Sequence, residues 1–569
     1  LRRAQRGNSW LVRGFLDPLV LTATLIRGRS QTELSSARSD ASALSLSYNL
    51  QMQRRGPRLP FGGLIGGLPR WIRESEGGKA LREARLSLVP STVRWASGLT
   101  RDQGDYSSFA VPITRPSDVL VRPTLSLSHL WKNSAGLTWQ PLGMLILNGD
   151  LTSTRDLRVY PDSTPIGRLA YAERRFLLGV PVGVERDRTL ITSLRLTPKI
   201  TSWLRPRFTT GSSFLLSRTL TSRPLVRDDG DSSGAFILPT TLNNSRSREV
   251  GASVDLGRAL RQVLGDTSGA AKAVARIRPF DLSSQLTRTS TFDLTAFEPG
   301  LGYMLGLGGL DRFLSQQGSD ALGASETQTT TLSSGAELPL GFTVTLSYSL
   351  TTTNRFQQLS EGSSETSIRQ REWPVGNLRW NRTFNGGPLT LVAAGVGIRR
   401  REGQSTQPAG AGVRAVSATI SSSFTPDLQL ALRNGMSLSF ALSARDQRTE
   451  NNGNSTFLDQ DDLTASFNHA FRLPFAIGRV RKQVRSSITA LNSKSLTCLE
   501  RPNEIACTII SDVRRQEIRG GLDTDLAQTL SGGLQFGYSI NDARHISRRT
   551  SQIFMMLTFQ VSMYAGDYQ

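Results

Sequence analysis

The sequence contains no long uninterrupted apolar run. The best candidate, residues 11–26, is broken by Arg13, Asp17 and Pro18. A transmembrane α-helix needs about 20 consecutive apolar residues, so the sequence excludes a helical membrane span. A membrane-crossing β-sheet stays open, because its apolar residues alternate with polar ones and hardly raise the mean hydropathy.

Histidine and cysteine are scarce, with three and two residues in a chain of 569. His129, His469 and His545 lie far apart in the sequence, and no group of His and Cys has the spacing of a metal site. The glycine-rich segment 300–309 lacks the spacing of a dinucleotide fingerprint, and the acidic segment 228–231 lacks the distal Glu of an EF-hand. We therefore expect no metal, no cofactor and no enzyme.

Lysine is also rare, so arginine supplies nearly all of the formal net charge of +22. A charge this high can indicate nucleic-acid binding. The arginines are, however, scattered through turns and polar strand positions, without the interleaved aromatics of a base-stacking surface. We expect no nucleic-acid partner, and we expect the arginines to lie near lipid phosphates or along a polar lumen.

The two cysteines flank a turn signal. Pro502 and Asn503 lie midway between Cys498 and Cys507, and Pro and Asn favour turns. If this is a hairpin tip, the thiols face each other closely enough for a disulfide, which would indicate an oxidising compartment. Two free thiols in a loop are the alternative.

What the sequence does contain is alternation. In residues 338–350 every second residue is apolar, and Thr and Ser fill most of the positions between. Side chains alternate between the faces of a strand, and a strand of this length at a tilt of about 45° crosses the roughly 30 Å hydrocarbon core of a bilayer. We predict that the apolar positions face lipid: Leu338, Leu340, Phe342, Val344, Leu346, Tyr348 and Leu350.

The final strand repeats the pattern, with predicted lipid-facing residues Ile553, Met555, Leu557, Phe559 and Val561. Similar runs recur along the chain, including a hairpin over residues 428–442 that turns at Asn434-Gly435, a strong hairpin signal. A further strand is predicted at 302–307, short helical insertions near 71–86 and 257–273, and long polar loops at 357–371 and 445–455.

These patterns predict an all-β chain. We expect residues 1–569 to form one large antiparallel transmembrane β-barrel region of roughly 20–26 strands, or part of one, and we take the chain to be the C-terminal part of a longer protein. A soluble sandwich also alternates, but it would leave exposed edges on so many long strands. With aromatics at 7%, the interfacial girdles must be thin; the candidates are Tyr48, Trp131, Trp139, Trp380, Phe424 and Tyr564.

Three stretches carry a family resemblance. Residues 131–155 resemble a strand–turn–strand unit, residues 174–208 a segment with a Trp before a Pro-containing strand, and residues 297–306 a Pro-Gly strand, of the SprA family. This family is the gliding-motility cell-surface protein and outer-membrane translocon of type 9 secretion, and the likeness covers its C-terminal portion. The resemblance implies a wide barrel that passes secreted protein cargo and is gated by periplasmic plug proteins.

Together with the predicted membrane-crossing strands, the resemblance implies a passive protein-secretion channel in the bacterial outer membrane, with outer-membrane lipid as a further partner. Two alternatives stay open. One is another outer-membrane transport barrel, of the lipopolysaccharide-assembly or TonB-dependent type. The other is a secreted, basic, β-rich surface or adhesion protein.

Overall fold

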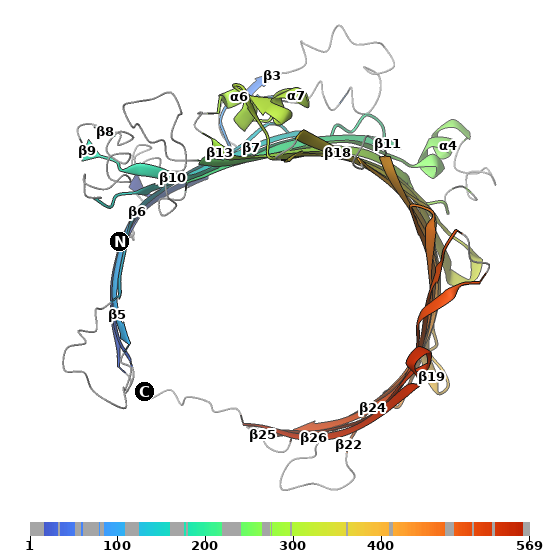
Figure 1. The fold of residues 1–569 in the computed structure, drawn as a ribbon. Coiled ribbons are helices and arrows are strands. Elements are labelled where there is room, and N and C mark those ends of the chain that lie inside the picture. The colour runs from blue at the N-terminus through green and yellow to red at the C-terminus, as the bar shows by residue number, and fades with distance from the viewer. Residues whose placement is uncertain are drawn as a thin grey trace, which may run out of the picture. The chain divides into compact units, whose positions relative to one another are not determined.

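Long antiparallel strands make up most of the part of the chain that the structure describes (Figure 1). The computed structural model describes residues 16–31, 35–51, 58–60, 79, 85–108, 124–159, 176–177, 180–218, 240–264, 274, 276–295, 299–359, 362–408, 414–472, 483–502, 506–525 and 530–561. Within these ranges, twenty strands belong to one sheet. The prediction of an all-β chain with one large antiparallel sheet is confirmed, at the lower end of the predicted range of strand number.

The strands of the large sheet are 12 to 22 residues long, well above the 5 to 6 residues typical of soluble proteins. In chain order they are β1 (Leu19–Gln31), β2 (Ser35–Gln51), β5 (Thr92–Ser108), β6 (Thr124–Leu142), β7 (Leu145–Asp156), β10 (Val184–Leu196), β11 (Leu204–Arg218), β12 (Thr240–Val254), β13 (Phe280–Thr295), β16 (Gly323–Glu337), β17 (Phe342–Leu359), β18 (Gly362–Thr383), β19 (Leu389–Pro408), β20 (Arg414–Leu432), β21 (Met436–Asn451), β22 (Asn454–Arg472), β23 (Gln483–Glu500), β24 (Thr508–Asp525), β25 (Leu530–Ala543) and β26 (Arg548–Val561).

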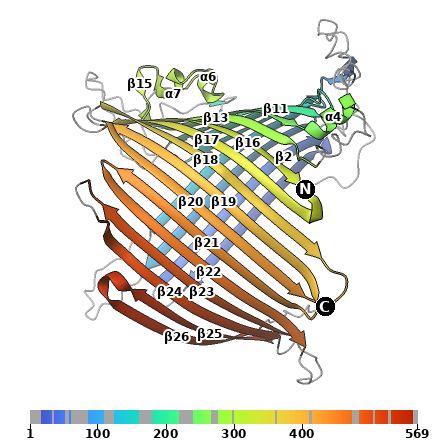
Figure 2. The same cartoon turned by 90° about the vertical axis from the view of Figure 1, so that its right-hand side faces the viewer.

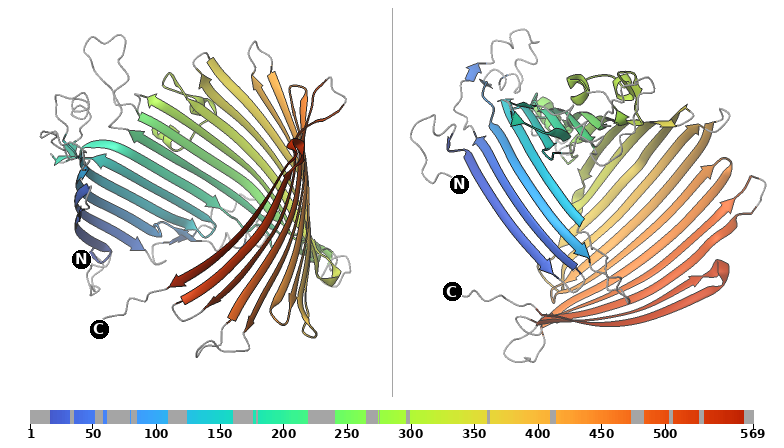
Figure 3. Two further views of the ribbon diagram at one scale, coloured as in Figure 1. Left: turned by 60° about the horizontal axis from the view of Figure 1, so that its bottom comes forward. Right: turned by 60° about the vertical axis from the view of Figure 1, so that its left-hand side comes forward.

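The chain divides into two compact units. Unit 1 comprises Leu1–Gly251, Gln285–Thr327 and Arg355–Ser364, and unit 2 comprises Ala252–Ser284, Gln328–Asn354 and Glu365–Gln569. In unit 1, strands β1, β2, β5, β6, β7, β10 and β11 pair antiparallel in chain order (Figure 3). In unit 2, strands β18 to β26 do the same (Figure 2).

Tight turns fix the register of unit 2. Gly435 has a positive φ of 82° in the turn from β20 to β21, at the predicted Asn-Gly position, so the predicted hairpin is confirmed. The predicted loops at 357–371 and 445–455 are wrong: β17, β18, β21 and β22 continue through them as far as the structure describes these residues. The backbone N–H and C=O groups of these polar residues still pair with the neighbouring strand. A polar sequence alone therefore does not end a strand.

A small cap interrupts the sheet of unit 1. It consists of helices α6 (Leu301–Met304) and α7 (Asp311–Leu314) and the hairpin of β14 (Ser315–Gln316) and β15 (Ser319–Asp320). The strand predicted at 302–307 is therefore wrong, and the segment that resembled a Pro-Gly strand is helical. The reason is tertiary: Tyr303 and Met304 are buried against Phe214, Leu242 and Phe292 of the sheet.

Other insertions are minor. Helix α4 (Leu256–Leu264) confirms a helical segment at the start of 257–273, and the remainder, 265–273, lies outside the described residues. Of the helix predicted near 71–86, most also lies outside them, and its end belongs to strand β4 (Arg85–Ser87), which pairs with β3 (Arg58–Pro60). A further hairpin joins β8 (Phe176–Leu177) to β9 (Val180–Pro181). Two 3-10 turns, η3 (Pro339–Gly341) and η5 (Arg544–Ile546), precede β17 and β26.

Candidate functional site

One face of unit 2 is a continuous apolar belt. A single row of directly opposite residues crosses nine strands, β18 to β26, without one charged side chain. The row consists of Trp380, Ala394, Leu428, Phe440, Ala465, Ala490, Ile518, Tyr538 and Ile553. Many of these side chains are exposed, including Phe440 at 42% and Ile518 at 50%. An exposed apolar surface of this extent is not tolerated in water.

The belt moves along the strands from β18 to β26. The row that starts at Ile398 and Phe424 passes through Ala444 and becomes charged in the later strands, at Asp461, Lys494, Arg514, Asp542 and Arg549. The apolar segment thus changes its position along the strand from one strand to the next. Because a membrane is flat, such a belt requires strands that are tilted to the membrane, as in transmembrane barrels. In Figure 2 strands β19 to β26 lie side by side and slope in the same direction, each antiparallel to its neighbours.

Aromatic pairs mark both edges of this belt on β17 and β18. Phe342 stacks on Trp380 with ring centroids 5.9 Å apart, and Tyr348 meets Trp373 at 6.3 Å. Phe342 and Tyr348 are six positions apart on β17, which corresponds to about 20 Å along a strand. Aromatic residues that flank an apolar band of about 25 Å are typical of transmembrane β-sheets.

The structure places most predicted lipid-facing residues on this apolar face. Phe342, Val344, Leu346, Tyr348 and Leu350 alternate along β17. Leu338 and Leu340 are not in the strand: η3 occupies Pro339–Gly341, and Leu340 has a positive φ of 67°. The predicted strand 338–350 therefore begins four residues late, because the Pro-Leu-Gly sequence forms a turn.

The last strand presents the same kind of face. Ile553, Met555, Leu557 and Phe559 are exposed by 79%, 78%, 62% and 59%. Val561 ends β26 opposite Leu530. Of the predicted aromatic girdle, Trp380 and Phe424 lie on the belt face of unit 2, and Tyr564 lies outside the described residues.

Unit 1 carries a belt of its own. Tyr48 lies opposite Trp95, and Leu44 lies opposite Leu99, which in turn faces Trp131. Two girdle candidates are anchored by their indole N–H groups: Trp131 donates to the Ser97 hydroxyl at 2.8 Å, and Trp139 donates to the Ser87 carbonyl at 2.9 Å. Antiparallel strands with such a face are those of outer-membrane proteins, so the chain is an outer-membrane protein, as the sequence predicts.

The opposite face of unit 2 is polar and carries arginines. Arg399 binds both carboxylate oxygens of Glu372 at 2.7 and 2.8 Å, and Arg401 lies 3.3 Å from the same group. Farther along the sheet, Glu517 is 6% exposed because the Arg515 guanidinium, at 2.6 Å, and Arg519 enclose it. Hydroxyl and amide side chains fill the positions between, and they line a hollow of about 470 Å³ beside Arg515. This surface can solvate a polar or anionic solute without strong binding.

The polar face of unit 1 has the same chemistry. Arg94 and Asp150 form an ion pair at 2.9 Å directly over Gly136. A Cβ at Gly136 would lie 2.5 Å from a carboxylate oxygen of Asp150, so a side chain at that position would require the Asp150 side chain to shift. Arg207 likewise pairs with Glu249 at 2.9 Å. These ion pairs stay on the face that lacks the apolar belt.

The cap is a packed cluster on the belt face of unit 1. Tyr303 lies at its centre, with its ring near those of Phe214 and Phe292 at 6.1 and 5.8 Å. Its hydroxyl shares a hydrogen bond with Ser290 at 2.8 Å. Burial raises the pKa of Tyr303 to about 12, which keeps its hydroxyl neutral in this packing.

Three arginines hold the loop between α6 and α7. Arg246 of β12 donates to the Gly306 carbonyl, Arg312 of α7 to that of Leu307, and Arg288 of β13 to that of Gly308. The cap is therefore fixed to the strands by side-chain hydrogen bonds as well as by apolar packing. Sequence reasoning missed it, because its aromatic partners come from β11 and β13, far apart in the chain.

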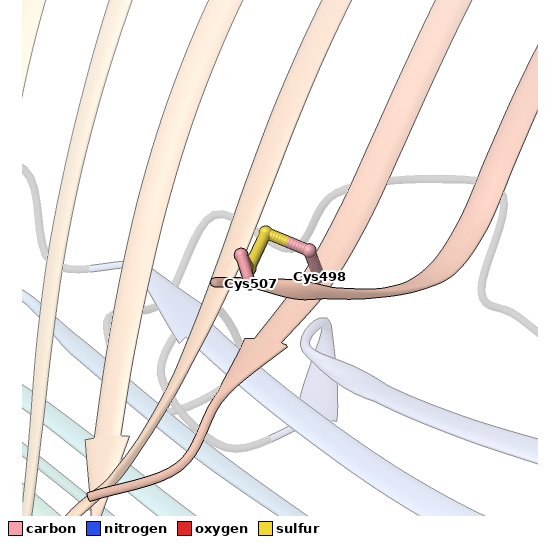
Figure 4. The surroundings of a disulfide bond; sticks show 2 residues. All are labelled: Cys498 and Cys507. Atoms are coloured by element: carbon pink, nitrogen blue, oxygen red, sulfur yellow. A yellow bond between two sulfur atoms is a disulfide. The ribbon is translucent and has the colours of Figure 1, made fainter. Parts of the chain in front are cut away.

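Cys498 and Cys507 form a disulfide, with an S–S distance of 2.02 Å (Figure 4). Cys498 lies near the end of β23, and Cys507 immediately precedes β24. The bond closes the connection between these two strands, at the end where the belt has given way to charged residues such as Lys494 and Arg514.

No cluster of His, Cys, Asp and Glu that could hold a metal occurs among the described residues. His129, His469 and His545 lie on β6, β22 and η5, and His545 accepts a hydrogen bond from the Asp512 backbone. No described helix is long and apolar enough to cross a membrane.

No protein-family model matches the sequence, and comparison with curated proteins finds no significant match. The chain is similar to the siderophore receptor PirA from Acinetobacter baumannii, with 10% identity and a TM-score of 0.25 over 91% of this chain and 75% of the receptor. It is also similar to the ferric enterobactin receptor PfeA from Pseudomonas aeruginosa, with 10% identity and a TM-score of 0.24 over 91% of this chain and 74% of the receptor. The likeness to the β domain of the Bordetella autotransporter BrkA has 12% identity and a TM-score of 0.18, and it covers 42% of this chain and 92% of that domain.

Proposed function

We propose that the chain forms the wall of a passive transport barrel in the outer membrane. The observation that supports this is the division of the sheet between two chemistries: a belt row across nine strands without a charge, and an opposite face of hydroxyls, amides and paired arginines. Lipid covers the first face, and water with passing solute meets the second. No covalent step is needed, so we do not propose an enzyme, and we propose no nucleic-acid partner.

The polar face also suggests a charge preference. Arg379, Arg399, Arg445, Arg515 and Arg519 lie on it, and their N–H donors suit anionic groups. An aqueous path along such a surface raises the local concentration of anions. We therefore expect the transported material to carry negatively charged groups.

Conductance across a planar bilayer tests the proposal. The purified full chain is expected to conduct ions and to prefer chloride over potassium, as read from the reversal potential in a salt gradient. Substitution of Arg445 and Arg515 by Gln is expected to lower that preference. A chain that inserts but conducts nothing would contradict the transport proposal.

Within this class, the resemblance to the SprA family supports a protein-secretion translocon. Its cargo would be secreted proteins, and periplasmic plug proteins would gate it. A translocon is expected to stay conductive in the presence of polymers too large for a solute pore. A barrel that such polymers do not enter, and that binds a small ligand tightly, would instead favour the receptor type of outer-membrane transport.

A secreted surface protein is the competing proposal of another class. Alkaline carbonate extraction of membranes separates the two, because a peripheral adhesin is released and a membrane-spanning sheet is retained.

A further inference from the structure

A hollow of about 410 Å³ opens on the belt face of β1, β2, β5 and β6. Leu25, Ser42, Arg101 and His129 form one row of opposite residues beside it. The adjoining row consists of Ala23, Leu44 and Leu99. Ser42 and Ala23 are small, whereas Leu25, Leu44, Leu99, Arg101 and His129 around them on the same face are larger, which leaves the hollow over Ser42 and Ala23.

The hollow lies at the edge of the belt. On its inner side are Leu44 and Leu99, exposed by 47% and 40%. On its outer side the next row contains Arg27 and Asp40, whose side chains lie 3.6 Å apart. A charged pair on the lipid side of a sheet indicates the level at which hydrocarbon gives way to headgroups. Arg101 therefore occupies the level of lipid phosphates.

Arg101 is exposed, and its five N–H donors are not committed to a carboxylate. Among the described residues, no acidic side chain lies within ion-pair distance of it. The nearest carboxylate in the register is that of Asp40, diagonal to Arg101, and it is already paired with Arg27 and Arg38. The imidazole of His129, directly opposite Arg101, adds a further hydrogen-bonding group.

We propose that this hollow is a binding site for a single anionic lipid of the surrounding membrane. One acyl chain lies in the depression over Ser42, against Leu25, Leu44 and Leu99. The lipid phosphate accepts hydrogen bonds from Arg101, whose planar guanidinium matches phosphate oxygens, and from His129.

The shape of the hollow favours a lipid over other occupants. Free phosphate would gain nothing from an apolar floor, of which Leu25 is exposed by 69%. A protein partner needs about 800 Å² of surface on each side for a stable interface, and a depression across four strands at the level of the membrane does not provide it. A phosphate joined to hydrocarbon satisfies both halves of the site.

Native mass spectrometry of the full chain in detergent tests this inference. The probes are dioleoyl phosphatidic acid, dioleoylglycerol with the same chains but no phosphate, and inorganic phosphate. Phosphatidic acid is expected to bind about tenfold or more tightly than dioleoylglycerol, because charge-assisted hydrogen bonds to phosphate are strong. Inorganic phosphate is expected not to bind at the same concentrations.

Two variants probe the two halves of the site independently. Arg101→Gln is expected to weaken phosphatidic acid binding about tenfold and to leave dioleoylglycerol unchanged, whereas Arg101→Lys retains most of the binding. Ser42→Leu fills the depression and is expected to abolish binding of both lipids. The control is Lys132→Gln, which removes one positive charge from the opposite face of β6 and is expected to change nothing.

The proposal would be overturned if Arg101→Gln and Ser42→Leu both bound phosphatidic acid as tightly as the wild type does. Inorganic phosphate bound as tightly as phosphatidic acid would overturn the lipid assignment. The inference depends on the belt facing lipid and not on transport, so a chain that conducts no ions can still bind the lipid.

Discussion

Placing a charge at the centre of the belt provides the sharpest test of the two-faced sheet. Phe440 lies between Leu428 and Ala465 on the apolar face, and Ala441, the next residue, lies between Asp427 and Thr464 on the polar face. Arg at the bilayer midplane of a transmembrane strand costs about 2–4 kcal/mol, so Phe440→Arg is expected to shift the folding equilibrium about 30- to 1,000-fold towards the unfolded state.

Ala441→Arg is the matched control, because it adds the same side chain one residue away. There the guanidinium reaches water and the Asp427 carboxylate, so the free energy of unfolding is expected to change by less than about 0.5 kcal/mol. The assay is reversible unfolding by urea in phosphatidylcholine vesicles, followed by tryptophan fluorescence.

The reasoning is refuted if Ala441→Arg destabilises the protein as much as Phe440→Arg does. That result would mean that the two faces of β21 do not differ in their contact with lipid. A shift of one residue in the register exchanges the two faces of a strand, so a larger effect of Ala441→Arg than of Phe440→Arg would mean that the apolar side chains point away from lipid. Equal and small effects of both variants would show that neither residue lies in hydrocarbon.

Three further predictions concern single interactions. Glu517→Gln is expected to destabilise the protein by about 1–3 kcal/mol, because two arginines lose a shared carboxylate, and to increase the anion preference measured by reversal potential. Tyr303 has a raised pKa of about 12, so its contribution to cap stability is present below its unfolded pKa of about 10 and is lost as the pH rises through the folded value. Limited proteolysis between pH 9 and 12 is expected to show this opening in the wild type and not in Tyr303→Phe. The Cys498→Ser, Cys507→Ser double variant is expected to lose about 2–3 kcal/mol by loop entropy, measured by hydrogen exchange at the ends of β23 and β24; unchanged exchange would contradict it.

Alternation in the sequence was sufficient to predict individual strands and their faces. Apolar residues alternate on both sides of Asn434-Gly435: Leu428 and Leu430 before it, Leu438 and Phe440 after it. The two-residue turn and the alternation together allow only one pairing register for these two strands. The ends of strands were harder to predict. Polar residues such as Arg445 do not signal whether the backbone continues its ladder, since outside the hydrocarbon both faces of a strand meet water.

The resemblance to a secretion family stays a prediction. One of the three segments that carried it, residues 297–306, was assigned to a strand and forms α6 instead. A run of Gly, Leu, Tyr and Met fits either an apolar strand face or one turn of a buried helix, and local sequence does not distinguish these.

The sequence alone determined the class of this protein, because a two-residue period with oily and hydroxyl positions specifies which side of each strand must avoid water. Only the tertiary structure decided which strands shift against one another, where Tyr303 finds its aromatic partners, and that Arg101 and His129 meet over Ser42. Those features depend on contacts between residues distant in the chain, and such contacts are set by the register of many strands together.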